Sequence, residues 1–307
     1  MGTTHVRRTP EDRFENLPDY PFSPNYLEID GGALGPLRMH YVDEGPRDGP
    51  VVLLLHGEPT WSYLYRKMIP PLAQSGFRVL APDFIGFGKS DKISDRNAYS
   101  YLGHVDWMKE WTGKLGLRDI TFFGQDWGGL IGLRLVAEMP ELFARVMIGN
   151  TGLPTGDQDL GEAFKQWREF SQTTPTFNIG GIVSRGTARG MGDDVIAAYD
   201  APFPEEDFKA GARAFPMLVP ASPDDPAAPA QRAAWESLRK FEKPFLTCFS
   251  DKDMIMRGGE AVFKKLIPGA AGQEHFITEN ASHFLQEDAG PLLAEKLIAF
   301  ATANDGK

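Results

Sequence analysis

The feature that most constrains the fold of this chain is a regular alternation of apolar runs with longer segments of helical character. Largely apolar runs occur at residues 51–55, 77–81 and 120–123, and each is bounded by turn-forming residues. Such runs are typical of strands that are buried on both faces of a sheet. Segments of helical length occur at residues 99–115 and 130–138. This alternation is the pattern of βαβ units and predicts an α/β fold with a mostly parallel sheet flanked by helices.

The pattern changes after Asn150. Residues 152–230 are rich in Gly, Pro, Phe and acidic residues, contain only short helix-like stretches and lack a long aliphatic run. The strand and helix pattern then returns at residues 244–249, 259–266, 275–278 and 291–301. We therefore expect a core domain made of residues 1–151 and 231–307, interrupted by a helical cap at residues 152–230.

The charge balance argues against polyanionic partners. The chain has 307 residues with 32 Lys and Arg against 42 Asp and Glu, which gives a formal net charge of -10. Such a field repels phosphate backbones and anionic lipid, so we expect no nucleic acid and no membrane as partners. No apolar run is long enough to span a bilayer, and the N-terminal segment lacks the apolar region of a signal peptide. The single Cys248 lies in an apolar run and is expected to be a buried, inert thiol. These features predict a cytoplasmic protein, which we expect to be a monomer.

The most informative local motif is the pentapeptide Gly-Gln-Asp-Trp-Gly at residues 124–128, between a predicted strand and a predicted helix. Its spacing is that of a nucleophile elbow, a strained turn in which glycines allow close backbone packing. The central side chain of such a turn projects from the C-terminal edge of the sheet. That residue is Asp126, which could alternatively serve only to cap the next helix. The functional interpretation gains support from what lies elsewhere in the chain.

Candidate acid and base residues follow in the chain order nucleophile, acid, histidine, which is the order of α/β hydrolases. Asp251 and Asp253 both come after the predicted strand at residues 244–249, and we favour Asp253 as the acid. His283 lies in a polar loop between residues 275–278 and the last helix, where the general base of this fold belongs. We expect the other histidines to be structural or exposed.

An oxyanion hole is expected beside the elbow. In this fold one backbone N–H comes from the loop after an early central strand, and the other comes from the residue after the nucleophile. The strand at residues 51–55 leads into His56, Gly57, Glu58 and Pro59. The predicted donors are therefore the backbone N–H groups of Glu58 and Trp127.

The segments HGEPTW at residues 56–61, DWGG at 126–129 and SHF at 282–284 closely resemble the haloalkane dehalogenases, and the resemblance covers nearly the whole chain. It implies an α/β-hydrolase fold with an eight-stranded sheet and an inserted helical cap. It also implies hydrolysis of small haloalkanes to alcohol, halide and a proton, with no metal or cofactor. In one branch of the family the acid follows the seventh strand, and in another the sixth. Asn150 ends the sixth predicted strand and cannot be a carboxylate, which supports Asp253 and the first branch.

The expected chemistry explains why these residue types are needed. Ionised Asp126 can displace a halide from carbon without a base, which gives a covalent alkyl-enzyme ester. The departing halide needs hydrogen-bond donors in an apolar site, and indole N–H groups can supply them. Trp127 and, by the resemblance, Trp167 are the predicted halide-binding pair; Trp235 is the other candidate in that region. His283 would then activate a water molecule that hydrolyses the ester, with Asp253 orienting the imidazole ring.

Three other functions are considered. An epoxide hydrolase resembles this pattern but protonates its substrate with two cap tyrosines, and Tyr199 is the only tyrosine between Asn150 and Phe241. A fluoroacetate dehalogenase has Arg beside the nucleophile, where this chain has Trp127. A non-catalytic binding protein of the same fold would not need a complete set of site residues. Because the cap is short and rich in bulky side chains, we expect a small cavity that suits short brominated substrates.

Overall fold

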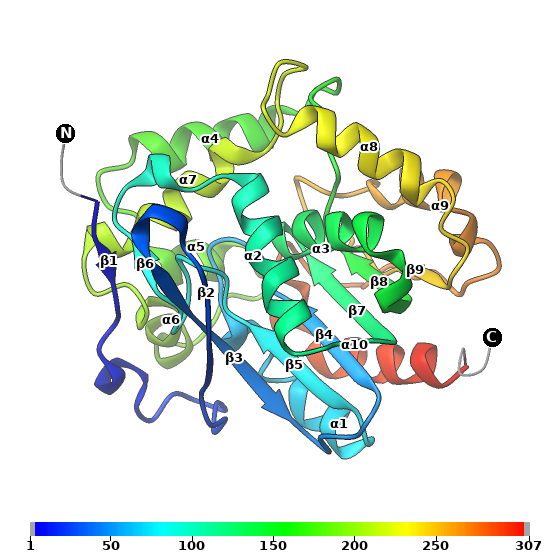
Figure 1. Cartoon of the computed structure of the whole chain (residues 1–307), viewed down its shortest axis with the longest axis horizontal. Helices are drawn as coiled ribbons and strands as arrows, with labels where there is room; N and C mark the ends of the chain where they lie inside the picture. The colour runs from blue at the N-terminus through cyan, green and yellow to red at the C-terminus, as the bar shows by residue number, and fades with distance from the viewer. Residues whose placement is uncertain (1–3, 304–307) are drawn as a thin grey trace.

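The computed structural model describes residues 4–303, and a seven-stranded sheet forms its centre (Figure 1). In spatial order the strands are β2 (Asn25–Asp30), β3 (Pro36–Glu44), β5 (Arg78–Pro82), β4 (Val51–Leu55), β7 (Ile120–Gln125), β8 (Phe143–Gly149) and β9 (Phe245–Thr247). Strands β5, β4, β7, β8 and β9 run parallel to one another, whereas β2 and β3 add antiparallel pairs at one edge. The predicted α/β fold with a mostly parallel sheet is confirmed.

The sheet has one strand fewer than the eight expected. Residues 275–278 form only an isolated parallel bridge, between Ser250 and Thr278. The backbone N–H of Thr247 donates a hydrogen bond to Nδ1 of His275 at 3.1 Å, where a regular ladder would offer a backbone carbonyl. Backbone hydrogen bonds still join the two segments, from Phe276 N–H to the Thr247 carbonyl oxygen at 3.2 Å and from Thr278 N–H to that of Phe249 at 2.7 Å, so the segment runs beside β9 without forming a regular strand. Within residues 4–303 a separate two-stranded sheet joins β1 (Val6–Arg7) to β6 (Lys92–Ile93).

Helices cover both faces of the sheet. Helix α1 (Ile69–Gln74) packs against α10 (Leu285–Ala303), while α3 (Trp127–Glu138) packs against α2 (Tyr101–Lys114) and α8 (Ala228–Leu238). Figure 1 shows α10 on the face opposite to α2 and α3. Helix α9 (Glu260–Leu266) follows β9 in the chain. No helix within residues 4–303 combines the length and the apolar character needed to cross a membrane.

Four α-helices, one short 3-10 helix (Glu206–Lys209) and no strand occupy the described chain between β8 and α8; the α-helices are α4 (Glu162–Thr173), α5 (Ile179–Arg185), α6 (Asp193–Asp200) and α7 (Ala210–Leu218). The helix-like stretches that the sequence shows at residues 161–172 and 193–199 match α4 and α6 to within one residue at each end. The sequence did not predict α5 and α7, because Gly180 and Gly181 lie in the first turn of α5 and Pro216 lies inside α7. Such residues normally weaken or break a helix, so tertiary packing overrides local preference here.

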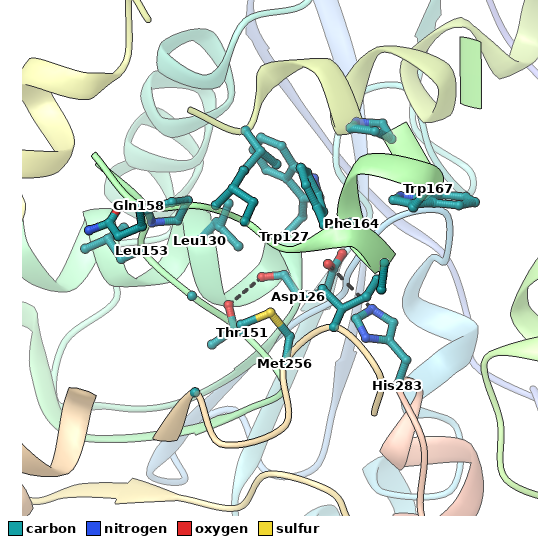
Figure 2. A pocket seen from close by; sticks show the side chains of 18 of the residues that line it. Asp126, Trp127, Leu130, Thr151, Leu153, Gln158, Phe164, Trp167, Met256 and His283 are labelled. Carbon is teal, nitrogen blue, oxygen red and sulfur yellow. Dashed lines mark hydrogen bonds and ion pairs between the residues drawn. The ribbon is translucent and has the colours of Figure 1, made fainter. Parts of the chain in front are cut away.

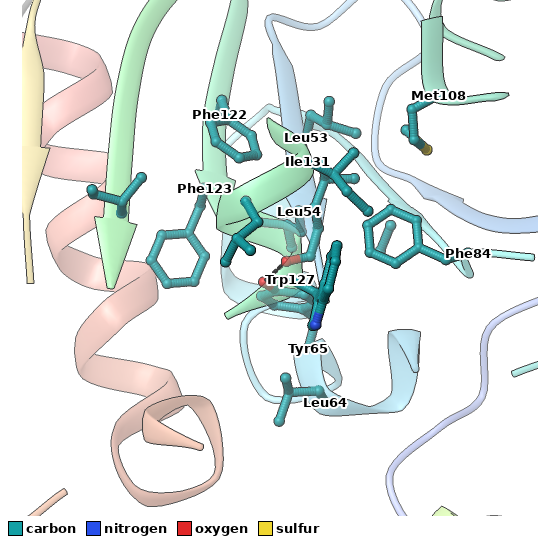
Figure 3. Packing of buried hydrophobic residues seen from close by; sticks show 14 of the residues in the cluster. Leu53, Leu54, Leu64, Tyr65, Phe84, Met108, Phe122, Phe123, Trp127 and Ile131 are labelled. Atoms are coloured by element: carbon teal, nitrogen blue, oxygen red, sulfur yellow. Dashed lines mark hydrogen bonds between the residues drawn. The ribbon is translucent and has the colours of Figure 1, made fainter. Parts of the chain in front are cut away.

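The core explains why the central strands are apolar on both faces. Neighbouring residues of β4, Leu53 and Leu54, are fully buried, as are Phe122 and Phe123 of β7. Because successive side chains point to opposite faces of a sheet, both faces must be covered. Figure 3 shows these side chains packed with residues of the flanking helices. Cys248 is fully buried, and burial raises the pKa of its thiol, which agrees with the inert role expected.

Candidate active site

Asp126 occupies a strained turn between β7 and α3. Its backbone has φ +52° and ψ -125°, a conformation that non-glycine residues rarely adopt. The glycines around it are required by close packing: a Cβ on Gly128 would lie 1.8 Å from the carbonyl oxygen of Leu55. A Cβ on Gly57 would lie 2.6 Å from Oδ1 of Asp126 itself. The geometry is that of the nucleophile elbow predicted from residues 124–128.

Asp126, His283 and Asp253 come together at the C-terminal edge of the sheet. Nδ1 of His283 lies 2.8 Å from Oδ2 of Asp253, and Nε2 of His283 lies 3.6 Å from Oδ2 of Asp126. The Asp126 and His283 side chains are 22% and 16% exposed, whereas that of Asp253 is 1% exposed. A molecule in the cavity can therefore reach the first two residues, while Asp253 lies behind the ring. Asp251 does not contact His283; its Oδ1 accepts a hydrogen bond from the backbone N–H of Ala281 at 3.1 Å.

The two carboxylates control the charge of the histidine. Burial alone would lower the pKa of His283, but the nearby charges of Asp253 and Asp126 hold that pKa well above its usual value. Burial opposes ionisation of Asp253 as well, yet the charge and hydrogen bond of His283 keep the pKa of Asp253 below its ordinary value. The backbone N–H groups of Ile255 and Met256 also donate to Oδ1 of Asp253, at 2.8 and 3.1 Å. Asp253 is thereby held as an anion that orients the ring.

Backbone donors lie where the oxyanion hole was predicted. The N–H of Glu58 donates to Oδ1 of Asp126 at 2.7 Å. The N–H of Trp127 is the first of helix α3, and no acceptor for it lies within residues 4–303. The side chain of Glu58 is buried beside Asp126, and burial together with the charge of Asp126 raises its pKa well above the usual value. Ionisation of the Glu58 carboxyl group is therefore disfavoured.

A cavity of about 1160 Å³ opens over Asp126 and His283. Figure 2 shows these two side chains facing each other, with Trp127 and Trp167 also in the cavity wall. The sequence led us to expect a small cavity, and that prediction is wrong. The cavity continues from Asp126 to a groove between residues 151–160 and helices α8 and α9. Sequence patterns could not place these three segments beside the elbow.

Three of the tryptophans line this cavity, but they differ in what their N–H groups bind. Nε1 of Trp235 donates to the carbonyl oxygen of Leu153 at 2.8 Å and is therefore occupied. Within the described chain, Nε1 of Trp127 and Nε1 of Trp167 have no acceptor. Trp127 is held by Tyr101 and Phe215, with ring centroids 5.0 and 4.5 Å away. Two indole donors are thus free to bind a ligand in the cavity.

Sequence reasoning missed two buried amides beside the triad. Nδ2 of Asn150 donates to the carbonyl oxygens of Ser282 and His283, at 2.9 and 3.0 Å. Nε2 of Gln125 lies 3.2 Å from Nε2 of His283. Gln125 ends β7 and Asn150 directly follows β8, at the same edge of the sheet. A polar residue at the end of an apolar strand was the sequence signal that could have identified both as site residues. Across the part of the chain that the structure describes, no group of three or more His, Cys, Asp and Glu residues is arranged to hold a metal ion.

Comparisons with known proteins agree with this geometry. A family model described as the alpha/beta hydrolase fold matches residues 50–290. Haloalkane dehalogenases of Psychrobacter cryohalolentis and Mycolicibacterium paratuberculosis are 56% and 55% identical to this chain, each over 97% of it and 99% of the relative. Among solved structures, the haloalkane dehalogenase DpaA of Paraglaciecola agarilytica matches with a TM-score of 0.89 and 37% identity, over 96% of this chain and 98% of that one. DpaA is described as tetrameric, which does not fit the monomer expected from the sequence. With the elbow, the triad and these full-length relatives, the chain belongs to the haloalkane dehalogenase family of α/β hydrolases.

Proposed function

We propose that this protein hydrolyses haloalkanes in two steps, through a covalent ester on Asp126. The observation that carries the proposal is that one cavity holds Asp126, His283 and two indole N–H groups without acceptors. In the first step Oδ2 of Asp126 attacks the carbon that bears the halogen. A carbon–oxygen bond forms, and the halide leaves with the bonding electron pair. The indole N–H groups of Trp127 and Trp167 bind the halide, so that the new anion has hydrogen-bond donors in an apolar site.

In the second step His283 takes a proton from water, and the hydroxide oxygen attacks the ester carbonyl carbon of Asp126. The backbone N–H groups of Glu58 and Trp127 bind the oxyanion. Its collapse breaks the bond between the carbonyl carbon and the alkoxide oxygen, and the alkoxide takes the remaining hydroxyl proton, which gives the alcohol and restores the carboxylate. Esterification removes one of the two negative charges that raise the pKa of His283. The pKa of the ring therefore falls, so that more of His283 is neutral and able to accept a proton at the stage at which a base is required. The proton finally leaves His283 for solvent.

The free indole N–H of Trp167, compared with the occupied one of Trp235, gives a direct test of halide binding. The Trp167→Phe variant should bind bromide roughly 10- to 150-fold more weakly, because one hydrogen bond to a charged group contributes about 1.5–3 kcal/mol. The Trp235→Phe variant removes an indole from the same cavity and should change the bromide dissociation constant much less. Titration with bromide, followed by intrinsic fluorescence, measures both. Equal weakening in the two variants would contradict the assignment of Trp167.

The structure gives little support to an epoxide hydrolase. Tyr199 is fully buried, and its hydroxyl donates to Oε1 of Glu287 at 2.5 Å instead of facing the cavity. The residues between Asn150 and Phe241 thus offer no tyrosine pair that could protonate an epoxide oxygen. A binding protein with a vestigial site would have no need for an Asp253–His283 hydrogen bond of 2.8 Å beside the elbow.

The proposed division of the chain follows the same chemistry. We assign residues 1–151 and 231–307 to the catalytic core and residues 152–230 to a cap, because α4 carries Trp167 into the cavity wall. We also retain a cytoplasmic location as a prediction.

Bromide release from 1,2-dibromoethane by the purified protein tests the activity. Ion chromatography should detect bromide well above the background of a heat-inactivated sample. Styrene oxide, assayed in parallel for diol formation, should not be turned over. The proposal is wrong if the diol is formed and bromide is not.

A further inference from the structure

Gln125 is a buried amide that the proposed mechanism does not use, although it lies between two parts of the site. It is the last residue of β7, directly before Asp126, and its side chain is fully buried. Its Nε2 lies 3.1 Å from the carbonyl oxygen of His283 and 3.2 Å from the ring Nε2 of His283. A Cβ built on Gly57, in the loop after β4, would lie 2.9 Å from Oε1 of Gln125. The amide therefore spans the oxyanion loop and the histidine loop.

The carbonyl oxygen of His283 determines which way the amide points. A carbonyl can only accept a hydrogen bond, so the NH₂ group of Gln125 must face the histidine loop. One of its hydrogens binds this carbonyl, which also accepts from Nδ2 of Asn150 at 3.0 Å. The other hydrogen then faces the ring Nε2 of His283. That nitrogen can meet a donor only with its lone pair, so the ring proton belongs on Nδ1, where it donates to Oδ2 of Asp253.

The other charged or titratable groups that face this ring act differently. Asp126 in the elbow and Asp253 in the loop after β9 are carboxylates that favour a protonated ring. Glu58, in the loop after β4, is buried, and its burial and the charge of Asp126 raise its pKa, whereas a protonated His283 lowers it. Burial of the ring opposes a proton on Nε2 of His283, and among the hydrogen-bonding groups of residues 4–303 the amide of Gln125 opposes it too. Its effect becomes decisive when Asp126 is esterified, because one of the two opposing charges is then lost.

We infer that Gln125 is a positioning residue that holds His283 as a neutral base, with the Nε2 lone pair available at the ester stage. This inference rests on the proposed function, because it concerns the second step of the same reaction. The contact of 3.2 Å is long for a hydrogen bond, so the O–H of the hydrolytic water can replace it at little cost. The bond to the carbonyl oxygen remains and keeps the ring in place. A proton of the water then passes to Nε2 while the water oxygen attacks the side-chain ester carbon of Asp126.

The Gln125→Glu variant tests this role, because it replaces a donor with an acceptor of the same shape. A carboxylate beside Nε2 favours the protonated ring. The apparent pKa of the acid limb in the pH–rate profile of ester hydrolysis should therefore rise by about one to three units. Alkylation needs no base, so the initial burst of about one bromide per site should remain. Rapid-quench measurements with 1,2-dibromoethane over a range of pH separate the two steps. Bromide reports alkylation, and 2-bromoethanol reports hydrolysis.

Two further variants keep the test decisive. Gln125→Met removes the donor without adding charge. It should slow ester hydrolysis and raise the apparent pKa of the acid limb by less than Gln125→Glu does. This variant decides the question if Gln125→Glu does not fold. Gln231→Glu places the same change at another fully buried glutamine, whose partners are Tyr101 and Arg134, and should leave the limb in place. An unmoved acid limb in both Gln125 variants would overturn the inference. Absence of any bromide release by the wild type would instead refute the proposed function itself.

Discussion

Replacing Asp126 with Asn should reduce bromide release by a factor on the order of 10⁵ to 10⁶, as expected when an enzyme loses its nucleophile. The amide has the same shape but cannot displace a halide. The fold should be kept, because Asn is among the few residues that tolerate a positive φ such as the +52° found here. Removal of the negative charge should also strengthen bromide binding, which gives a second readout of an intact cavity. Steady-state bromide release and a bromide titration measure the two effects.

Asp119 provides the control for this variant. It lies directly before β7, at the opposite end of the strand from Asp126, and has a nearly equal φ of +50°. Its side chain is exposed and does not line the cavity, so Asp119→Asn should turn over like the wild type. If Asp126→Asn releases bromide at a rate close to that of Asp119→Asn, then another group is the nucleophile.

Replacing His283 with Phe should stop the reaction after about one bromide per site, because the base is needed only to hydrolyse the ester. The alkyl group should remain on the protein as a mass increase on the peptide that contains Asp126. Phe occupies a similar volume and can keep the edge-to-face contact that the His283 ring makes with Phe284, at a centroid distance of 4.9 Å. Rapid quench followed by peptide mass spectrometry measures both the burst and the adduct.

The matched control is His5→Phe, since His5 is exposed and does not line the cavity. It should show continuous turnover without an adduct. Continuous turnover by His283→Phe would assign the base to another residue. No burst and no adduct, in a variant that still binds bromide, would mean that water attacks the substrate directly.

Much of the site followed from short-range patterns. Glycines at fixed positions around Asp126 predicted the elbow. Any other residue at position 128 would place its Cβ 1.8 Å from the carbonyl oxygen of Leu55, and glycine avoids this clash. The chain order predicted that His283 and an acid after β9 would meet Asp126, and the structure places them together. Their catalytic roles stay predictions until the variants are measured.

Other features depended on contacts between distant parts of the chain. The family resemblance favoured Trp167 over Trp235, but the physical difference between them appears only in the structure, where the indole N–H of Trp235 is occupied by the carbonyl oxygen of Leu153, 82 residues away in the chain. The size of the cavity was misjudged for the same reason, since residues 151–160 and α8 form its outer wall. The role inferred for Gln125 arises only when β7 and the loop before α10 meet, 158 residues apart in the chain.

The sequence by itself therefore determined the α/β class, most of the central strands and the position of the elbow. These depend on hydrophobic periodicity and on local steric limits, which act over a few residues. The tertiary structure alone decided which indole donors stay free, how large the cavity is and which groups surround His283. Those outcomes depend on competition for hydrogen-bond partners and space among segments that meet only after folding, as when the carbonyl oxygen of Leu153 takes the indole N–H of Trp235.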